Sequence, residues 1–163
     1  MVTRVGIGYD SHRFADGGPM ILGGVQIDGD SHLAGHSDGD AIAHAVTDAI
    51  LGAAGAGDIG THFPDTDPAH RGRDSIEMLR TAVARVADRG FVPQQVDVTV
   101  IAERPRIGPV RAQMAVALGA ALGVAPEAVS VKGKSNEGMG WVGRHEGLAV
   151  IAVATIVGAR DSR

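Results

Sequence analysis

The chain has 163 residues, of which 15 are basic and 19 acidic, and its formal charge is -4. This length suits a single domain spanning residues 1–163, and the mild acidity argues against a nucleic-acid partner, which would need a basic surface. No cysteine is present, so disulfides, thiolate metal sites and a cysteine nucleophile are excluded. Glycine is unusually abundant, at 24 residues, whereas aromatic residues make up only 3%.

The sequence contains neither the apolar segment of a signal peptide near its start nor an apolar run long enough to span a bilayer. We therefore expect a cytoplasmic protein with no membrane partner. The longest apolar run, residues 148–159, is typical of a strand that is buried on both faces.

The first half of the chain combines β-branched runs, turn residues and one alanine-rich stretch. Ser37 has an acidic residue three positions later and is the expected N-cap of the first helix. The expected elements are a strand over 2–9, two short strands within 20–27, a loop over 31–36, a helix from Ser37 to about 54 and a loop over 58–73.

The second half alternates between helical and strand patterns. Asp74 is the expected N-cap of its first helix, which ends before Gly90. The expected elements are a helix over 74–89, a strand over 95–101, a turn over 102–108, a helix over 110–122, a strand over 129–132, a loop over 135–143 and a strand over 145–157. This order predicts an α/β or α+β fold with one sheet backed by helices.

Three side chains have the spacing of a metal site. Asp10 and His12 share one face of the first strand, and His44 lies on the first helix. One carboxylate and two imidazoles leave an open coordination position, as in catalytic zinc sites, and also match the facial triad of iron oxygenases. Alternatively, His44 is a hydrogen-bonded core histidine, and Asp10 and His12 only end a strand.

Several glycine-rich segments are candidates for binding phosphate. Residues 36–40 precede a helix, whose free N–H groups attract anions, and residues 132–144 contain glycine, lysine and arginine. Asp65 and Asp67 offer oxygens to sugar hydroxyls or a cation. The alternatives are a solvated loop at 132–144 and ordinary turn chemistry around Asp65.

Taken together, the motifs resemble those of the 2-C-methyl-D-erythritol 2,4-cyclodiphosphate synthase family, from Val5 to about Val157. The stretch from His36 to Asp67 carries the most specific part of the resemblance. The segments that match are Gly8–Phe14, His36–His44, Thr47–Asp48, Gly57–Gly60, Phe63–Asp67, Asp97–Ala102 and Gly140–Arg144.

The resemblance implies a homotrimer of ferredoxin-like subunits with active sites at the subunit interfaces. It also implies an intramolecular phosphoryl transfer in which a CDP-linked methylerythritol 2-phosphate is cyclised and CMP is released. A non-catalytic trimer that binds nucleotides or isoprenoid phosphates is the alternative. The implied ligands of Zn²⁺ are Asp10, His12 and His44, and Glu137 is the candidate ligand of a second cation, Mg²⁺ or Mn²⁺.

The resemblance further implies a role for each matching segment. His36 and Ser135 match positions that stabilise the transition state, residues 102–108 match the cytidine pocket, and residues 134–137 match the loop over the diphosphate. Lys134 and Asn136 replace residues that are often hydroxylic in the family, Trp141 replaces a common phenylalanine, and His145 replaces a frequent glycine. The residues implied to contact substrate are Asp10, His12, His36, Ser37, Asp58, Ile59, Gly60, Phe63, Asp65, Asp67, Ala102, Pro105, Arg106, Gly108, Lys134, Ser135, Asn136, Glu137, Trp141 and Arg144.

Overall fold

The computed structural model describes residues 1–64, 66–68 and 71–159. Its main feature is a five-stranded sheet in the order β4-β1-β7-β5-β6, in which β5 and β6 are parallel and the other neighbours antiparallel. The strands are β1 (Val2–Asp16), β4 (Ser31–Leu33), β5 (Phe91–Ile101), β6 (Val129–Lys134) and β7 (Gly147–Gly158). A separate hairpin consists of β2 (Met20–Leu22) and β3 (Val25–Ile27).

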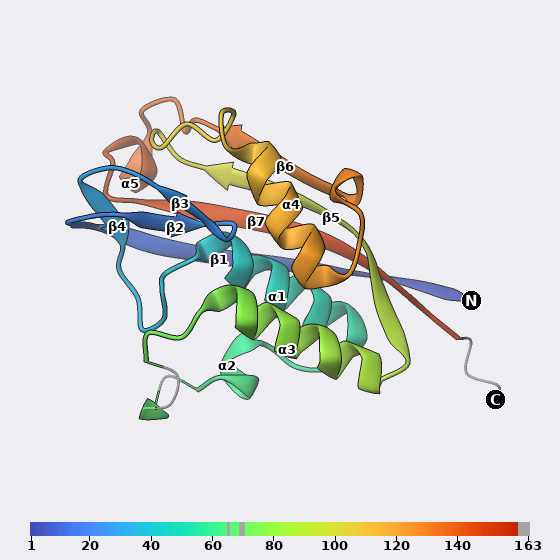
Figure 1. The fold of residues 1–163 in the computed structure, drawn as a ribbon. Helices are drawn as coiled ribbons and strands as arrows, with labels where there is room; N and C mark the ends of the chain where they lie inside the picture. The colour runs from blue at the N-terminus through green and yellow to red at the C-terminus, as the bar shows by residue number, and fades with distance from the viewer. Residues whose placement is uncertain (65, 69–70, 160–163) are drawn as a thin grey trace.

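Three long helices cover one face of this sheet, as Figure 1 shows. They are α1 (Ala41–Ala54), α3 (Ser75–Asp88) and α4 (Arg111–Leu122). Asp74 caps α3 as predicted, because its carboxylate accepts the N–H groups of Ile76 and Glu77. The predicted α/β class, with one sheet backed by helices, is confirmed.

Strand β1, which lies next to the central strand β7, packs directly on α1. A Cβ atom added at Gly8 would lie 1.8 Å from the carbonyl oxygen of Ala45, and one added at Gly6 would lie 2.0 Å from that of Ala49. Only glycine permits this approach of strand backbone to helix backbone. The close contact fixes the far end of β1, which carries Asp10 and His12, beside the start of α1.

The first helix begins later than predicted. Asp40, rather than Ser37, is its N-cap, and the Asp40 carboxylate accepts the N–H of Ala43. That carboxylate is fully buried and also accepts the N–H groups of Gly23 and Gly24, from the β2–β3 hairpin. These distant donors favour Asp40 over Ser37, whose hydroxyl is engaged elsewhere.

Several strands and short helices depart from their predicted bounds. β1 continues to Asp16, well past residue 9, because residues 14–16 pair with residues 31–33. The latter residues form β4, where a loop was predicted. Short helices α2 (Ile59–His62) and α5 (Gly140–Gly143) lie within predicted loops, and Pro126–Ala128 form a 3₁₀ turn.

The final strand is fully buried on one face but only partly buried on the other in this chain, contrary to the prediction. Leu148 and Ile156 on its helix-facing side are fully buried, whereas Val153 on the other side is 38% exposed. Val153 pairs with Ile7 of β1, which is 69% exposed. No helix in the described part of the chain is long and apolar enough to cross a membrane.

Candidate metal centre and active site

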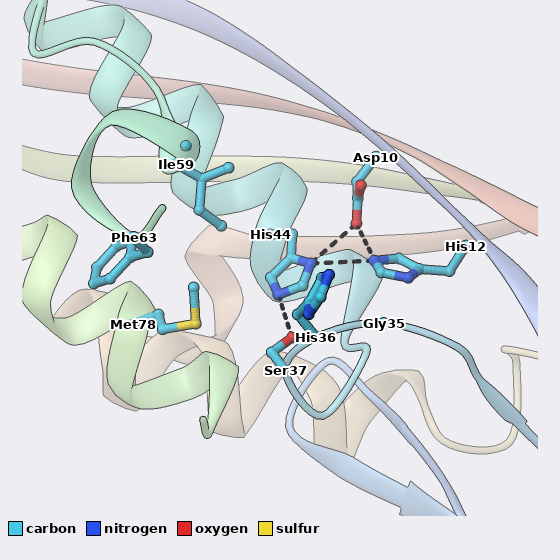
Figure 2. Close-up of a pocket in the computed structure, with 10 residues that line it drawn as sticks. Asp10, His12, Gly35, His36, Ser37, His44, Ile59, Phe63 and Met78 are labelled. Atoms are coloured by element: carbon cyan, nitrogen blue, oxygen red, sulfur yellow. Dashed lines mark hydrogen bonds and ion pairs between the residues drawn. The ribbon is translucent and has the colours of Figure 1, made fainter. Parts of the chain in front are cut away.

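Asp10, His12 and His44 converge on one point at the start of α1, as Figure 2 shows. Asp10 Oδ2 lies 2.9 Å from His12 Nε2 and 3.1 Å from His44 Nδ1, and the two ring nitrogens are 3.3 Å apart. Ligands of a tetrahedral zinc ion, at ~2.0–2.2 Å from the metal, stand about 3.4 Å from one another. The observed triangle matches that geometry to within about half an ångström.

Hydrogen bonds behind the two imidazoles set their tautomers. His12 Nδ1 donates to the carbonyl oxygen of Ala34 at 2.6 Å, which leaves Nε2 with its lone pair toward the centre of the triangle. His44 Nε2 contacts the hydroxyls of Ser37 at 3.0 Å and Ser75 at 2.9 Å. In its neutral form, each ring therefore presents an unprotonated nitrogen to a metal.

Ser75 connects His44 to a carboxylate. Its hydroxyl donates to Asp38 Oδ1, so its lone pair is available to accept the N–H of His44 Nε2. Partners of this kind orient metal-binding histidines and raise their basicity. Ser75 is fully buried, as the first residue of α3.

The three ligand candidates also perturb one another's protonation. Burial raises the pKa of Asp10, but hydrogen bonds from His12 and His44 outweigh it and hold that pKa below its usual value. Burial lowers the pKa of His12, but the hydrogen bond and charge of Asp10 act in the opposite direction, and the net result is a pKa above its usual value. Protons and metal ions therefore compete for the His12 nitrogen.

A cavity of about 260 Å³ opens beside this cluster. Of the predicted substrate residues outside the cluster, five line it. Those five are Gly60, Phe63, His36, Ser37 and Ile59. Met78 of α3 also lines the cavity, although the sequence offered no reason to separate it from the other apolar residues of that helix.

The remaining acidic residues of this region have other positions. Asp58 caps α2, where its carboxylate accepts both the N–H and the hydroxyl of Thr61, and these bonds lower its pKa. Asp67 does not line the cavity. Asp65 lies outside the described residues.

A second cavity, of about 610 Å³, follows the end of β5. It brings together most of the predicted cytidine segment with two residues of the predicted diphosphate loop. The lining residues are Ala102, Glu103, Pro105, Arg106, Ile107, Gly108, Pro109, Arg111, Gly133, Lys134 and Ser135. Glu103 and Ile107 lie within the predicted cytidine segment but were not named as contact residues, whereas Pro109, Arg111 and Gly133 lie outside the predicted set. No lining residue is shared with the first cavity.

The loop after Ser135 is held by its own hydrogen bonds. Glu137 Oε1 accepts the hydroxyl of Ser135 at 3.0 Å. The Asn136 side-chain amide donates to the carbonyl of Met139 at 2.8 Å, so it braces the loop. Glu137 adopts a φ of 53°, in the left-handed region.

Trp141 lies in the short helix α5 that follows that loop, and Arg144 is the first residue after the helix. Arg144 pairs with Glu146, with Nε 2.7 Å from Oε1, and Trp141 lines a small cavity with His12 and Glu146. His145 has a φ of 59°, which accounts physically for the glycine frequent at this position, and its ring stacks on Phe14.

Comparison with known proteins adds independent evidence to this geometry. The family model described as "YgbB family" matches residues 3–157, which is nearly the whole chain. The chain belongs to the YgbB family. A family relative from Gemmatimonas aurantiaca, named 2-C-methyl-D-erythritol 2,4-cyclodiphosphate synthase, is 60% identical over 99% of this chain and 98% of its own length.

Solved structures of YgbB-type proteins share the fold. The Plasmodium falciparum IspF in its CDP complex is 32% identical, with a TM-score of 0.84 over 97% of both chains. The bifunctional IspDF from Campylobacter jejuni is 37% identical, with a TM-score of 0.93 over 99% of this chain. This chain spans only 44% of that bifunctional protein.

Within this member of the YgbB family, the predicted site residues form separate groups. Asp10, His12 and His44 are the one group of metal-ligating side chains that the described residues assemble. Glu137 and Ser135 belong to the loop at the second cavity. Among the described residues, the cavity beside the predicted metal centre and the predicted nucleotide pocket share no lining residue.

Proposed function

We propose that the chain converts 4-diphosphocytidyl-2-C-methyl-D-erythritol 2-phosphate to 2-C-methyl-D-erythritol 2,4-cyclodiphosphate and CMP. The carrying observation is the triangle of Asp10, His12 and His44 beside a cavity, in a chain 60% identical over 99% of its length to a protein named as that synthase. A metal-ligand set with an open coordination position is typical of catalytic zinc sites, which favours catalysis over binding alone.

The three ligand residues are proposed to hold Zn²⁺, since imidazole and carboxylate with tetrahedral geometry suit that ion. When bound, the ion would neutralise phosphate charge and polarise a phosphoryl oxygen. We assign Glu137 to a second, harder cation, Mg²⁺ or Mn²⁺, because such ions prefer carboxylate and phosphate oxygens.

The bond changes require no side-chain nucleophile. An oxygen of the 2-phosphate, already anionic near neutral pH, forms a bond to the β-phosphorus. The bond from that phosphorus to the oxygen bridging to the α-phosphorus breaks, and its electron pair leaves with CMP. The protein must fold the substrate so that two anions meet, which is a matter of positioning and charge.

The other residues that line the two cavities are proposed to contact different parts of the substrate. His36 and Ser37, beside the metal triangle, would hold the attacking phosphate region. Ile59, Gly60 and Phe63 would enclose the methylerythritol unit. At the second cavity, backbone groups of residues 102–108 would read the cytosine, and Lys134 and Ser135 would stabilise the diphosphate.

We further propose that the active site is completed between chains of a homotrimer. The two cavities share no lining residue, yet one substrate must reach both. The sheet also has an apolar face that its own helices leave uncovered. This face consists of Val5 at 64%, Ile7 at 69%, Tyr9 at 56% and Val153 at 38% exposure. Packing of such faces around a symmetry axis would bury them.

The catalytic proposal is tested by His44→Ala, assayed for zinc content and for CMP release from the CDP-linked substrate. We expect loss of the metal and of CMP release, because two ligands bind zinc far more weakly than three. The control is His32→Ala, on β4 outside the cavity. Unchanged zinc content and turnover in His44→Ala would refute the proposal, and CDP binding by the wild type without CMP release would favour the non-catalytic binder.

The assembly proposal is tested by sedimentation. The wild type should have a mass of about 50 kDa, three times the 16.7 kDa chain, and Ile7→Asp should shift it toward the monomer. Val116→Asp is the matched control, since Val116 is 57% exposed on α4, on the other side of the molecule's core. A wild-type mass near that of one chain would reject the trimer.

A further inference from the structure

Glu103 connects the two segments that form the second cavity. It is the second residue after β5, next to Ala102, and its carboxylate oxygen Oε1 contacts the loop after Ser135. That single oxygen accepts the backbone N–H of Asn136 at 3.0 Å and the backbone N–H of Gly138 at 3.2 Å. The Glu103 side chain therefore binds two backbone groups that lie 33 and 35 positions after it in the sequence.

The two N–H groups that Glu103 accepts flank Glu137. A φ of 53° is unfavourable for a residue with a Cβ atom, so the surroundings must hold Glu137 in this conformation. The carboxylate supplies that hold, because two N–H groups can meet one oxygen only when the backbone turns sharply between them. In this conformation the Glu137 carboxylate lies against the Ser135 hydroxyl, at 3.0 Å.

We propose that Glu103 is a positioning residue that keeps the loop over residues 135–139 in the shape needed to receive a diphosphate. It acts through the loop backbone and links that loop to the segment proposed to read the nucleoside. The proposal rests on the proposed function, because it takes Ser135 and Glu137 as the groups that receive the β-phosphate and its cation.

Removal of the Glu103 carboxylate should weaken binding of the diphosphate part of a nucleotide without weakening binding of its nucleoside part. In Glu103→Ala the loop loses its acceptor and populates other backbone conformations, and apparent affinity falls by the fraction that stays competent. We expect the dissociation constant for CDP with Mg²⁺ to rise roughly tenfold, comparable to loss of one charge-assisted hydrogen bond. CMP, which has no β-phosphate, should bind within about twofold of wild type.

Two further variants test whether the effect depends on the acceptor oxygen of Glu103. Glu103→Gln keeps an acceptor oxygen on the same side chain without its charge, so CDP affinity should recover to within about threefold of wild type. Glu127→Ala, on the 3₁₀ turn and exposed, removes a carboxylate that contacts neither cavity and should leave both affinities unchanged.

The experiment measures CDP and CMP binding by calorimetry, with Mg²⁺ present, and amide hydrogen exchange at Asn136 and Gly138 by NMR. We expect both amides to exchange faster in Glu103→Ala than in wild type, and to a smaller extent in Glu103→Gln. Equal weakening of CDP and CMP would overturn the proposal, since Glu103 would then only support the nucleoside pocket. Unchanged CDP affinity would overturn it as well.

The exchange measurement keeps this proposal separate from the proposed function. If wild type binds neither nucleotide, the proposed function fails, while exchange at Asn136 and Gly138 still tests whether Glu103 holds the loop. If Glu103→Ala does not fold, Glu103→Met decides, because it keeps the length of the side chain without an acceptor oxygen, and exchange rates as slow as those of the wild type would overturn the proposal.

Discussion

Ser75→Ala removes one hydroxyl behind the metal triangle and leaves the three ligand residues intact. The hydroxyl accepts the His44 Nε2 proton at 2.9 Å and donates to Asp38. Alanine nearly preserves the volume, and Ser75 is fully buried, so the change is confined to these hydrogen bonds. His44 retains one acceptor, the Ser37 hydroxyl at 3.0 Å.

The remaining acceptor sets the expected size of the effect. Loss of an outer partner of a metal-binding histidine typically weakens metal affinity by ~10–100-fold, and one surviving acceptor places Ser75→Ala near tenfold. The double variant Ser37→Ala/Ser75→Ala leaves His44 Nε2 without either hydroxyl and should approach ~100-fold. Asp38 also loses a donor, so unfolding free energy should fall by about 2 kcal/mol.

Zinc affinity is measured by competition with a chromophoric chelator, and stability by thermal melting, where about 2 kcal/mol corresponds to a fall of ~4–8 °C. Thr81→Ala is the matched control, because Thr81 is on the same helix and its hydroxyl bonds only a backbone carbonyl, that of Glu77. Wild-type zinc affinity in both the single and the double variant would refute the reasoning. An equal loss in Thr81→Ala would refute it too.

Two further predictions concern stability. Gly8→Ala would place a Cβ atom 1.8 Å from the Ala45 carbonyl oxygen, so the free energy of unfolding in urea should fall by about 3 kcal/mol. Gly52→Ala, with open space around the added Cβ atom, should raise the free energy of unfolding by ~0.5–1 kcal/mol. Equal effects of the two substitutions would contradict the strand–helix contact. Lys132, with Nζ 2.6 Å from Asp97, holds the pKa of Asp97 below its usual value of 3.8. Because a depressed carboxyl pKa stabilises the fold above the unfolded pKa, Lys132→Met should cost less than ~1 kcal/mol at pH 7, and this difference should shrink as the pH falls below 3.8; a constant difference would contradict it.

The local sequence pattern was sufficient to predict those elements whose formation depends only on their own residues. The three long helices follow from runs of helix-forming residues, and Asp74 was correctly predicted as the cap of α3. At the first helix, Ser37 and Asp40 are both good caps. Asp40 is the cap because its buried carboxylate also accepts the N–H groups of Gly23 and Gly24, which no local pattern includes.

The sequence predicted which residue types could bind a metal, but only part of how those residues are arranged in space. Period two in a strand places Asp10 and His12 on one face whatever the rest of the fold does. Their meeting with His44 depends on β1 packing against α1 through glycine. That contact brings the three side chains together, which favours a metal site over the alternatives of a core histidine or a strand end.

By itself, the sequence determined the residue types and the chemistry: two histidines and a carboxylate for a metal, glycine-rich loops for phosphate, and no thiol. It also determined the family, since matches of motif and order extend over nearly the whole chain. Only the tertiary structure decided that Ser75 orients His44 and that Glu103 holds the loop at Glu137. The physical reason is that these hydrogen bonds join residues more than 30 positions apart, where neither helical nor strand periodicity relates one side chain to the other.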